Sequence, residues 1–234
     1  MTKADPLALP FDQYQRYRLV ADLLGELRRA TGRKTPFRVL DVGGRTALLR
    51  RFLERDRITL VDLEPALERG LVLGDGGRLP FQSASFDVVT AFDTLEHVPP
   101  GAREAFVAEC RRVAQSWVIL AGPYHSERVA EAEELLKRFL AQKLGVEHRY
   151  LNEHRAHGLP ERSAVEAQLA ALGGEVASVG HANLDRWLVL MCLSMYMDAD
   201  PALRPLAAAF HRFYNASLYA SDHAAPVYRH ALVA

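Results

Sequence analysis

The chain has few cysteines, no excess of either charge and no long apolar run. Its two cysteines, Cys110 and Cys192, lie in apolar helical stretches, which favours reduced core residues and argues against a disulfide scaffold. The 29 basic and 29 acidic residues cancel, so a nucleic-acid substrate or an anionic membrane surface is disfavoured. Residues 1–10 lack an apolar signal core, and residues 187–197 are too few to span a bilayer. We therefore expect a cytoplasmic protein without stable membrane insertion.

The chain also lacks the G-x-G-x-x-G pattern of dinucleotide-binding proteins after its first predicted strand. That strand, residues 37–42, instead carries Asp41 just before Gly43 and Gly44, and apolar residues with helical spacing follow over 46–55. A glycine turn leading into a helix presents free N–H groups and lets a ligand approach the main chain closely. A carboxylate at this point would attract an ammonium or sulfonium group, so we infer S-adenosylmethionine as the ligand.

Two further acids follow predicted strands downstream. Strand 57–62 ends on Asp62, where an acid accepts hydrogen bonds from ribose hydroxyls, and strand 70–74 leads to Asp75, which we expect to face the adenine amino group. The three acids, at positions 41, 62 and 75, should converge at one edge of the sheet.

Four segments in this order resemble the class I S-adenosylmethionine-dependent methyltransferases, and most closely their small-molecule branch, methyltransferase type 11 of the ubiquinone/menaquinone type. They are VLDVGG at 39–44, LVDLEP at 60–65, LPFQSASFDVV at 79–89 and LEHVP at 95–99. The resemblance covers residues 37–123 and implies an α/β fold, a doubly wound, Rossmann-like, seven-stranded and mostly parallel sheet with an antiparallel last strand. It implies cofactor contacts from Asp41, Gly43, Gly44, Arg45, Asp62, Leu63, Asp75, Gly76 and Phe92.

One departure concerns the glycine pattern. The family usually has Asp-x-Gly-x-Gly-x-Gly, whereas here the second and third glycines fall on Arg45 and Ala47. Ala47 is a mild change. Arg45 either points outward while Gly44 takes over the turn, or its guanidinium pairs with the cofactor carboxylate. A third alternative is that the site no longer binds the cofactor.

The alternation of strands and helices predicts a parallel, doubly wound sheet. We expect an N-terminal helical cap over residues 1–36 and a methyltransferase domain over 37–234. Within that domain we expect a lid-like connector at 144–160 and a helical insertion at 184–219, which adds a cover beside the sheet or the surface of a homodimer. The remaining expected helices are 11–29, 65–69, 101–114, 126–143 and 163–172. Ser163 is the expected N-cap of the last of these, in a capping box closed by Glu166. The remaining expected strands are 86–91, 116–121, 175–180 and 227–233.

Methyl transfer is an in-line displacement, so positioning and exclusion of water dominate, and a hydroxyl or ammonium acceptor also needs a base. His125, after the fifth strand, is the preferred base, and His97 is a second candidate or a support for the cofactor. We expect acceptor contacts from five residues: Tyr14, Tyr17, Tyr124, His154 and His157. For the two N-terminal tyrosines, plain core packing is the competing interpretation.

The histidines and glutamates of residues 147–160 do not have the spacing of a compact helical metal site, and the arginines among them oppose a cation, so no metal is expected. This connector is either a polar lid over the acceptor or a solvated loop. Together these patterns predict an S-adenosylmethionine-dependent methyltransferase for a small molecule, with oxygen as the favoured acceptor and sugar-like and quinone-like acceptors both open. The alternative is a non-catalytic binding or scaffold protein of the same fold.

Overall fold

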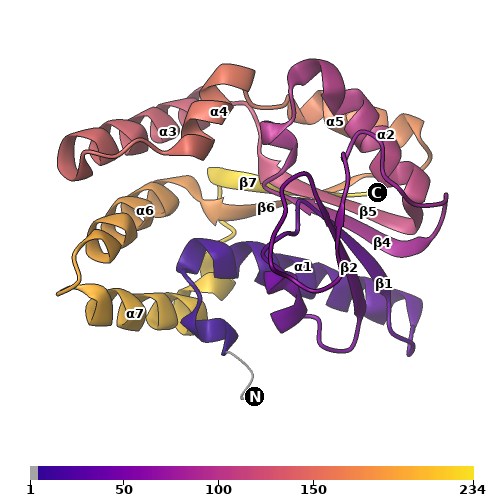
Figure 1. Cartoon of the computed structure of the whole chain (residues 1–234), viewed down its shortest axis with the longest axis horizontal. Helices are drawn as coiled ribbons and strands as arrows, with labels where there is room; N and C mark the ends of the chain where they lie inside the picture. Colours follow the sequence, from indigo (N-terminus) through magenta and orange to yellow (C-terminus); the bar gives the residue numbers. More distant parts are fainter. Residues whose placement is uncertain (1–4) are drawn as a thin grey trace.

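A seven-stranded sheet forms the centre of the molecule (Figure 1). The structure, a computed structural model, describes residues 5–234, so residues 1–4 of the expected N-terminal cap lie outside the described part. The strands are β1 (Arg38–Val42), β2 (Arg57–Asp62), β3 (Leu71–Leu73), β4 (Phe86–Phe92), β5 (Ala114–Pro123), β6 (Ala177–Asn183) and β7 (Val227–Val233), in the order β3-β2-β1-β4-β5-β7-β6. β7 runs antiparallel to both of its neighbours, while the other adjacent pairs are parallel. The predicted sheet is confirmed.

Helices cover both faces of this sheet. On one face, α1 (Phe11–Thr31) packs Leu19, Val20 and Leu24 against the apolar side chains of β1, β4 and β5. On the other face lie α2 (Arg103–Val113) and α5 (Arg162–Ala171). Burial on both sides explains why β1 and β4 are mostly apolar, and each strand carries one buried acid, Asp41 in β1 and Asp87 in β4.

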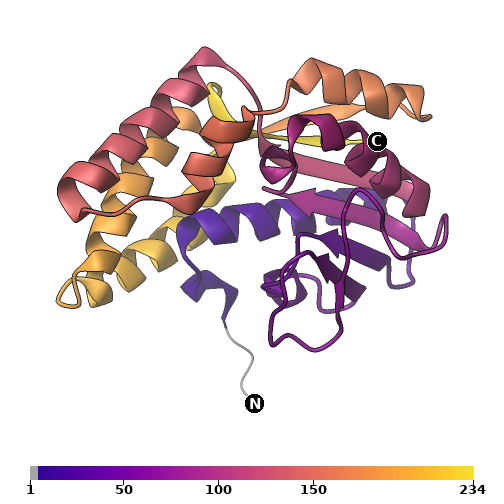
Figure 2. The ribbon, with the colours of Figure 1, turned by 45° about the horizontal axis from the view of Figure 1, so that its top comes forward.

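A second group of helices lies beyond the carboxyl ends of the parallel strands, at the left of Figures 1 and 2. It consists of α3 (Glu127–Phe139), α4 (Arg149–His157), α6 (Leu184–Ala199) and α7 (Arg204–Phe213). These helices share an apolar core with the start of α1, to which Phe11, Trp187 and Tyr214 contribute. Helices α6 and α7 fall between β6 and β7, which confirms the predicted insertion. Among residues 5–234, no helix combines the length and apolar character needed to cross a bilayer.

Two predicted helices near the glycine turn were wrong. In place of the helix at 46–55 there is one 3-10 turn, Leu48–Arg51, because the preceding Ala47 adopts a left-handed conformation with φ 53°. The helix was expected from the spacing of Ala47, Leu48, Phe52 and Leu53. Without a helix, Ala47 and Leu53 are still buried, and Leu48 and Phe52 are partly buried. Residues 65–69 form an irregular segment rather than a helix.

The expected connector, residues 144–160, contains the helix α4. The many charged residues of α4 leave no apolar stripe in the sequence, although Leu151 and His154 pack inward. The expected capping box at Ser163 was also wrong. The helix begins at Arg162 after Glu161, and the carboxylate of Glu166 lies 3.6 Å from the Arg162 guanidinium instead.

Candidate functional site

The turn after β1 depends on glycine at two positions. Gly43 has φ 82°, and its N–H donates to the carbonyl of Val61 at 2.8 Å. A Cβ atom on Gly43 would lie 2.5 Å from Oγ1 of Thr94, and one on Gly44 would lie 2.5 Å from Oδ2 of Asp41. The turn therefore packs its main chain directly against the Asp41 carboxyl and the segment after β4.

Asp41 is a buried acid with one unsatisfied oxygen. Its side chain is 4% exposed, and Oδ1 accepts a hydrogen bond from Oγ1 of Thr90 at 3.2 Å. Oδ2 is buried without a protein partner. Burial raises the pKa of Asp41 to about 7, and the nearby charge of Asp62 adds to the shift. Buried polar atoms are rarely left unpaired, so this oxygen points to a ligand that would satisfy it.

Asp62 lies at the end of β2, where main-chain N–H groups already hold its carboxylate. Oδ1 accepts from the N–H of Glu64 at 2.9 Å, and Oδ2 accepts from the N–H of Arg45 at 3.3 Å. Each oxygen keeps a further lone pair that can accept a hydroxyl. The neighbouring Leu63 is 71% exposed, so its apolar side chain is free to contact a ligand.

Arg45 points away from Asp41 and toward α4. Its guanidinium pairs with the carboxylate of Glu64 and donates to the hydroxyl of Tyr150 at 3.1 Å. Glu64 also accepts from the guanidinium of Arg149 at 2.7 Å. This arrangement corresponds to the outward orientation considered for Arg45, and it ties the glycine turn to the helix above it.

The remaining predicted cofactor residues lie after β3 and at the end of β4. Asp75 is exposed, and its carboxylate accepts from the N–H of Gly77 at 2.8 Å within its own turn. Gly76 is buried directly against the ring of Phe106, and Phe92 is 8% exposed. Asp41 and Asp62 are thus electrostatic neighbours, whereas Asp75 sits at the carboxyl end of the outer strand with its side chain engaged locally.

Helix α1 runs over the glycine turn. The hydroxyl of Tyr17 lies 2.9 Å from Oγ1 of Thr46, and burial raises the pKa of Tyr17, with the charge of Asp41 contributing. Tyr14 is 5% exposed and packs edge-on against Phe52 and Tyr219. Of the two tyrosines, Tyr17 is beside the turn and Tyr14 is part of the apolar core.

A network of buried ion pairs, which no sequence pattern predicted, holds the segment after β4 in place. Arg229 on β7 is 2% exposed and contacts the carboxylates of Asp93 at 2.8 Å and Asp12 at 2.7 Å. Arg16 joins through a 3.1 Å contact to Asp93. Burial opposes ionisation of Asp93, but the two arginines outweigh it and hold its pKa below the usual value. The network fixes α1 and β7 relative to the start of the LEHVP segment.

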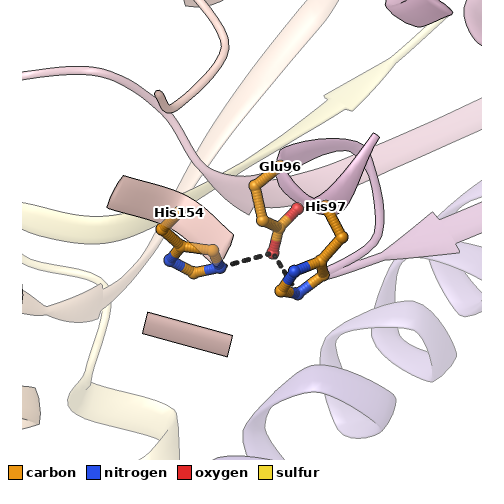
Figure 3. Close-up of side chains that lie close together, drawn as sticks. All are labelled: Glu96, His97 and His154. Atoms are coloured by element: carbon orange, nitrogen blue, oxygen red, sulfur yellow. Dashed lines mark ion pairs between the residues drawn. The ribbon is translucent and has the colours of Figure 1, made fainter. Parts of the chain in front are cut away.

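Three side chains converge beyond this network (Figure 3). Oε1 of Glu96, a residue 1% exposed, lies 3.9 Å from Nε2 of His97 and 3.9 Å from Nε2 of His154. Burial, with the charge of Asp93, raises the pKa of Glu96 well above its usual value. Burial and the neighbouring His154 lower the pKa of His97 to about 4. Tyr124 is buried nearby, and burial followed by the charge of Glu96 raises the pKa of its hydroxyl.

The other two histidines predicted for the site, His125 and His157, lie at the helices α3 and α4. The side chain of His125 is 51% exposed, with Nε2 4.0 Å from the carboxylate of Glu161. His125 and His154 both line a cavity of about 330 Å³ between α3 and α4. His157 borders a separate, open depression along α4. The fold therefore brings His154 against His97 and places it on the same cavity as His125, an arrangement that no sequence spacing indicated.

Known proteins resemble this chain in its fold and in part of its sequence. A family profile described as a methyltransferase domain matches residues 40–121. A protein of Anabaena variabilis, described as a methyltransferase from an antibiotic biosynthesis pathway, is 10% identical over 91% of this chain and 96% of its own, with a TM-score of 0.55. The YcgJ protein of Bacillus subtilis is 19% identical over 90% of this chain and 95% of its own, with a TM-score of 0.51. No curated protein sequence is significantly similar.

The profile match begins in β1, includes the glycine turn and the LEHVP segment, and ends within β5. The two structures share the fold over most of the chain. Residues 40–121 therefore match the methyltransferase domain, and the chain has the fold of these two structures.

Proposed function

We propose that the chain binds S-adenosylmethionine at the turn after β1 and transfers its methyl group to an oxygen atom of a small molecule. The observation that carries the proposal is the buried, unpaired Oδ2 of Asp41 beside the two glycines. An ammonium or sulfonium group at this position would satisfy the oxygen and favour the charged carboxylate.

The cofactor's other parts have partners at the same edge of the sheet. The lone pairs of Asp62 would accept the ribose hydroxyls, and Leu63 and Phe92 offer apolar surface to the adenosyl group. Asp75 and Gly76 would face the adenine. Arg45 already has Glu64 and Tyr150 as partners, so it does not need the cofactor carboxylate to balance its charge.

The acceptor would enter the cavity between α3 and α4. His125 and His154 line the cavity there, and a base at this position could take the proton of an acceptor hydroxyl as the methyl group arrives. Tyr17, held over the turn, would help to exclude water, with Tyr124 and His157 as further contacts. His125 is the preferred base because its ring is exposed at the cavity.

Calorimetry with S-adenosylhomocysteine and a methyl-transfer assay together test this proposal against the scaffold alternative. We expect one cofactor per chain, weaker binding for Asp62→Ala, and unchanged binding for Glu131→Ala, a control acid exposed on α3. Transfer of labelled methyl to a panel of sugar-like and quinone-like alcohols should depend on His125. Binding without transfer to any acceptor would favour the scaffold, and no binding at millimolar cofactor would reject both the site and the enzyme.

A further inference from the structure

We propose that Glu96, His97 and His154 form a binding site for one divalent transition-metal ion, with zinc as the best-fitting ion. Two imidazole nitrogens and one carboxylate oxygen, one from each residue, lie within 4.8 Å of one another (Figure 3). Two histidines and one carboxylate are a common ligand set for zinc and for other first-row metals.

The orientation of both imidazole rings supports the site. Nδ1 of His154 is hydrogen-bonded to the carboxylate of Glu133 at 2.9 Å. Nδ1 of His97 lies 2.9 Å from the carboxylate of Glu153, an ion-pair contact without hydrogen-bond geometry. A ring that donates its Nδ1–H to a carboxylate, as that of His154 can, keeps a free lone pair on Nε2. Both Nε2 atoms then face Glu96. Metal-binding histidines usually have this second carboxylate contact, which fixes the ring.

The atoms that face one another also lack other partners. Oε1 of Glu96 and Nε2 of His154 are both buried without a hydrogen bond, although their residues are only 1% and 6% exposed. The 3.9 Å separations are too long for hydrogen bonds. Ligands around a tetrahedral zinc ion are separated by about 3.3 Å, given bonds of about 2.0 Å. Closing the two glutamate–histidine pairs by about half an ångström would give this separation, and all three ligand atoms already lie within 4.8 Å of one another.

The chemistry of the ligands excludes the hard cations. Magnesium and calcium prefer oxygen ligands, whereas two of the three atoms here are imidazole nitrogens. Three protein ligands leave a coordination position that an oxygen of water or of a small molecule would fill. The ion would sit near the cofactor turn, since Thr94, two residues before Glu96, contacts Gly43. The site itself does not depend on methyl transfer.

Metal titration of the full, tag-free chain after chelation tests the site. We expect one Zn²⁺ per chain by calorimetry and, with Co²⁺, visible d–d absorption bands of a nitrogen and oxygen site. His154→Ala and Glu96→Gln should abolish the Co²⁺ bands. Glu133→Gln removes the carboxylate that orients His154 and should weaken binding about 10- to 100-fold. His223→Ala is the matched control, because this exposed histidine lies elsewhere, and it should bind as the wild type does.

Excess Mg²⁺ should not displace Co²⁺. The proposal is overturned if the wild type binds no ion, or if Zn²⁺ binds with equal affinity and stoichiometry to the wild type, His154→Ala and Glu96→Gln. Circular dichroism identifies any variant that fails to fold, and Glu96→Gln, which preserves the side-chain volume, then decides the result. Because the measurement is metal binding, its outcome is independent of whether the protein transfers a methyl group.

Discussion

Replacing Asp41 with asparagine removes its negative charge while keeping the shape of the side chain. The wild-type carboxyl is buried, and its pKa is raised to about 7, so it is only partly ionised near neutral pH without a ligand. A cofactor that carries positive charge needs the ionised form. We therefore expect S-adenosylmethionine affinity to rise with pH in the wild type and to lose this dependence in Asp41→Asn.

The size of the effect follows from the pKa of Asp41. At about pH 6, one unit below that pKa, only about one carboxyl in ten is ionised, so binding should be about tenfold weaker than at about pH 8. A factor of ten corresponds to about 1.4 kcal/mol. The variant should bind more weakly than the wild type at the higher pH.

The stability of the ligand-free protein should change in the opposite sense. The unfolded chain loses the Asp41 proton near pH 3.8, whereas the folded chain holds it up to about pH 7. The raised pKa therefore makes the free energy of unfolding fall as pH rises across this window, by about 1.4 kcal/mol per unit, and level off above it. Asp41→Asn lacks this contribution.

Calorimetric titrations of both proteins across this pH range measure the binding effect, and urea unfolding measures the stability effect. Comparing wild type with Asp41→Asn cancels the titration of the cofactor's own amino group. The reasoning is refuted if both proteins show the same pH dependence of cofactor affinity.

Four other substitutions test separate parts of the structure. Asp62→Ala should weaken cofactor binding by about 1.5 to 3 kcal/mol in calorimetry, and unchanged affinity rejects the ribose contact. Gly44→Ala puts a Cβ against the Asp41 carboxyl and should reduce cofactor affinity; equal affinity contradicts the packing. Arg229→Met leaves two buried acids without their partner and should lower the free energy of unfolding in urea by about 3 to 5 kcal/mol; a loss below 1 kcal/mol is inconsistent with the network. Burial lowers the pKa of His181 from 6.5 to about 3, so stability should fall as pH drops through that range, and urea unfolding of His181→Phe should show a shallower fall; an equal slope argues against this source.

The sheet and the glycine turn were predictable because their signals are local. The strand carrying Asp41 is apolar, central and bounded by glycine, and Asp62 ends the next strand in the same way. Helical segments between most of the strands then favour the parallel arrangement. The short turn after Ala47 was not predictable from spacing, because apolar residues four apart, such as Leu48 and Phe52, fit one turn as well as a long helix.

The charged clusters could not be predicted because their members are far apart in the chain. Arg229 meets Asp93 across 136 residues, and only the antiparallel position of β7 brings them together. His154 reaches Glu96 because α4 forms inside a segment too polar to show a helical stripe. Sequence patterns describe an element's own faces, whereas such contacts depend on how the elements pack.

A crystal structure of the protein with S-adenosylhomocysteine tests the cofactor assignment most directly. We predict the ribose hydroxyls on the carboxylate of Asp62, and the amino group of the ligand beside the unpaired oxygen of Asp41. A nucleoside bound elsewhere on the sheet, or an Asp41 oxygen that stays unpaired in the complex, would contradict the assignment.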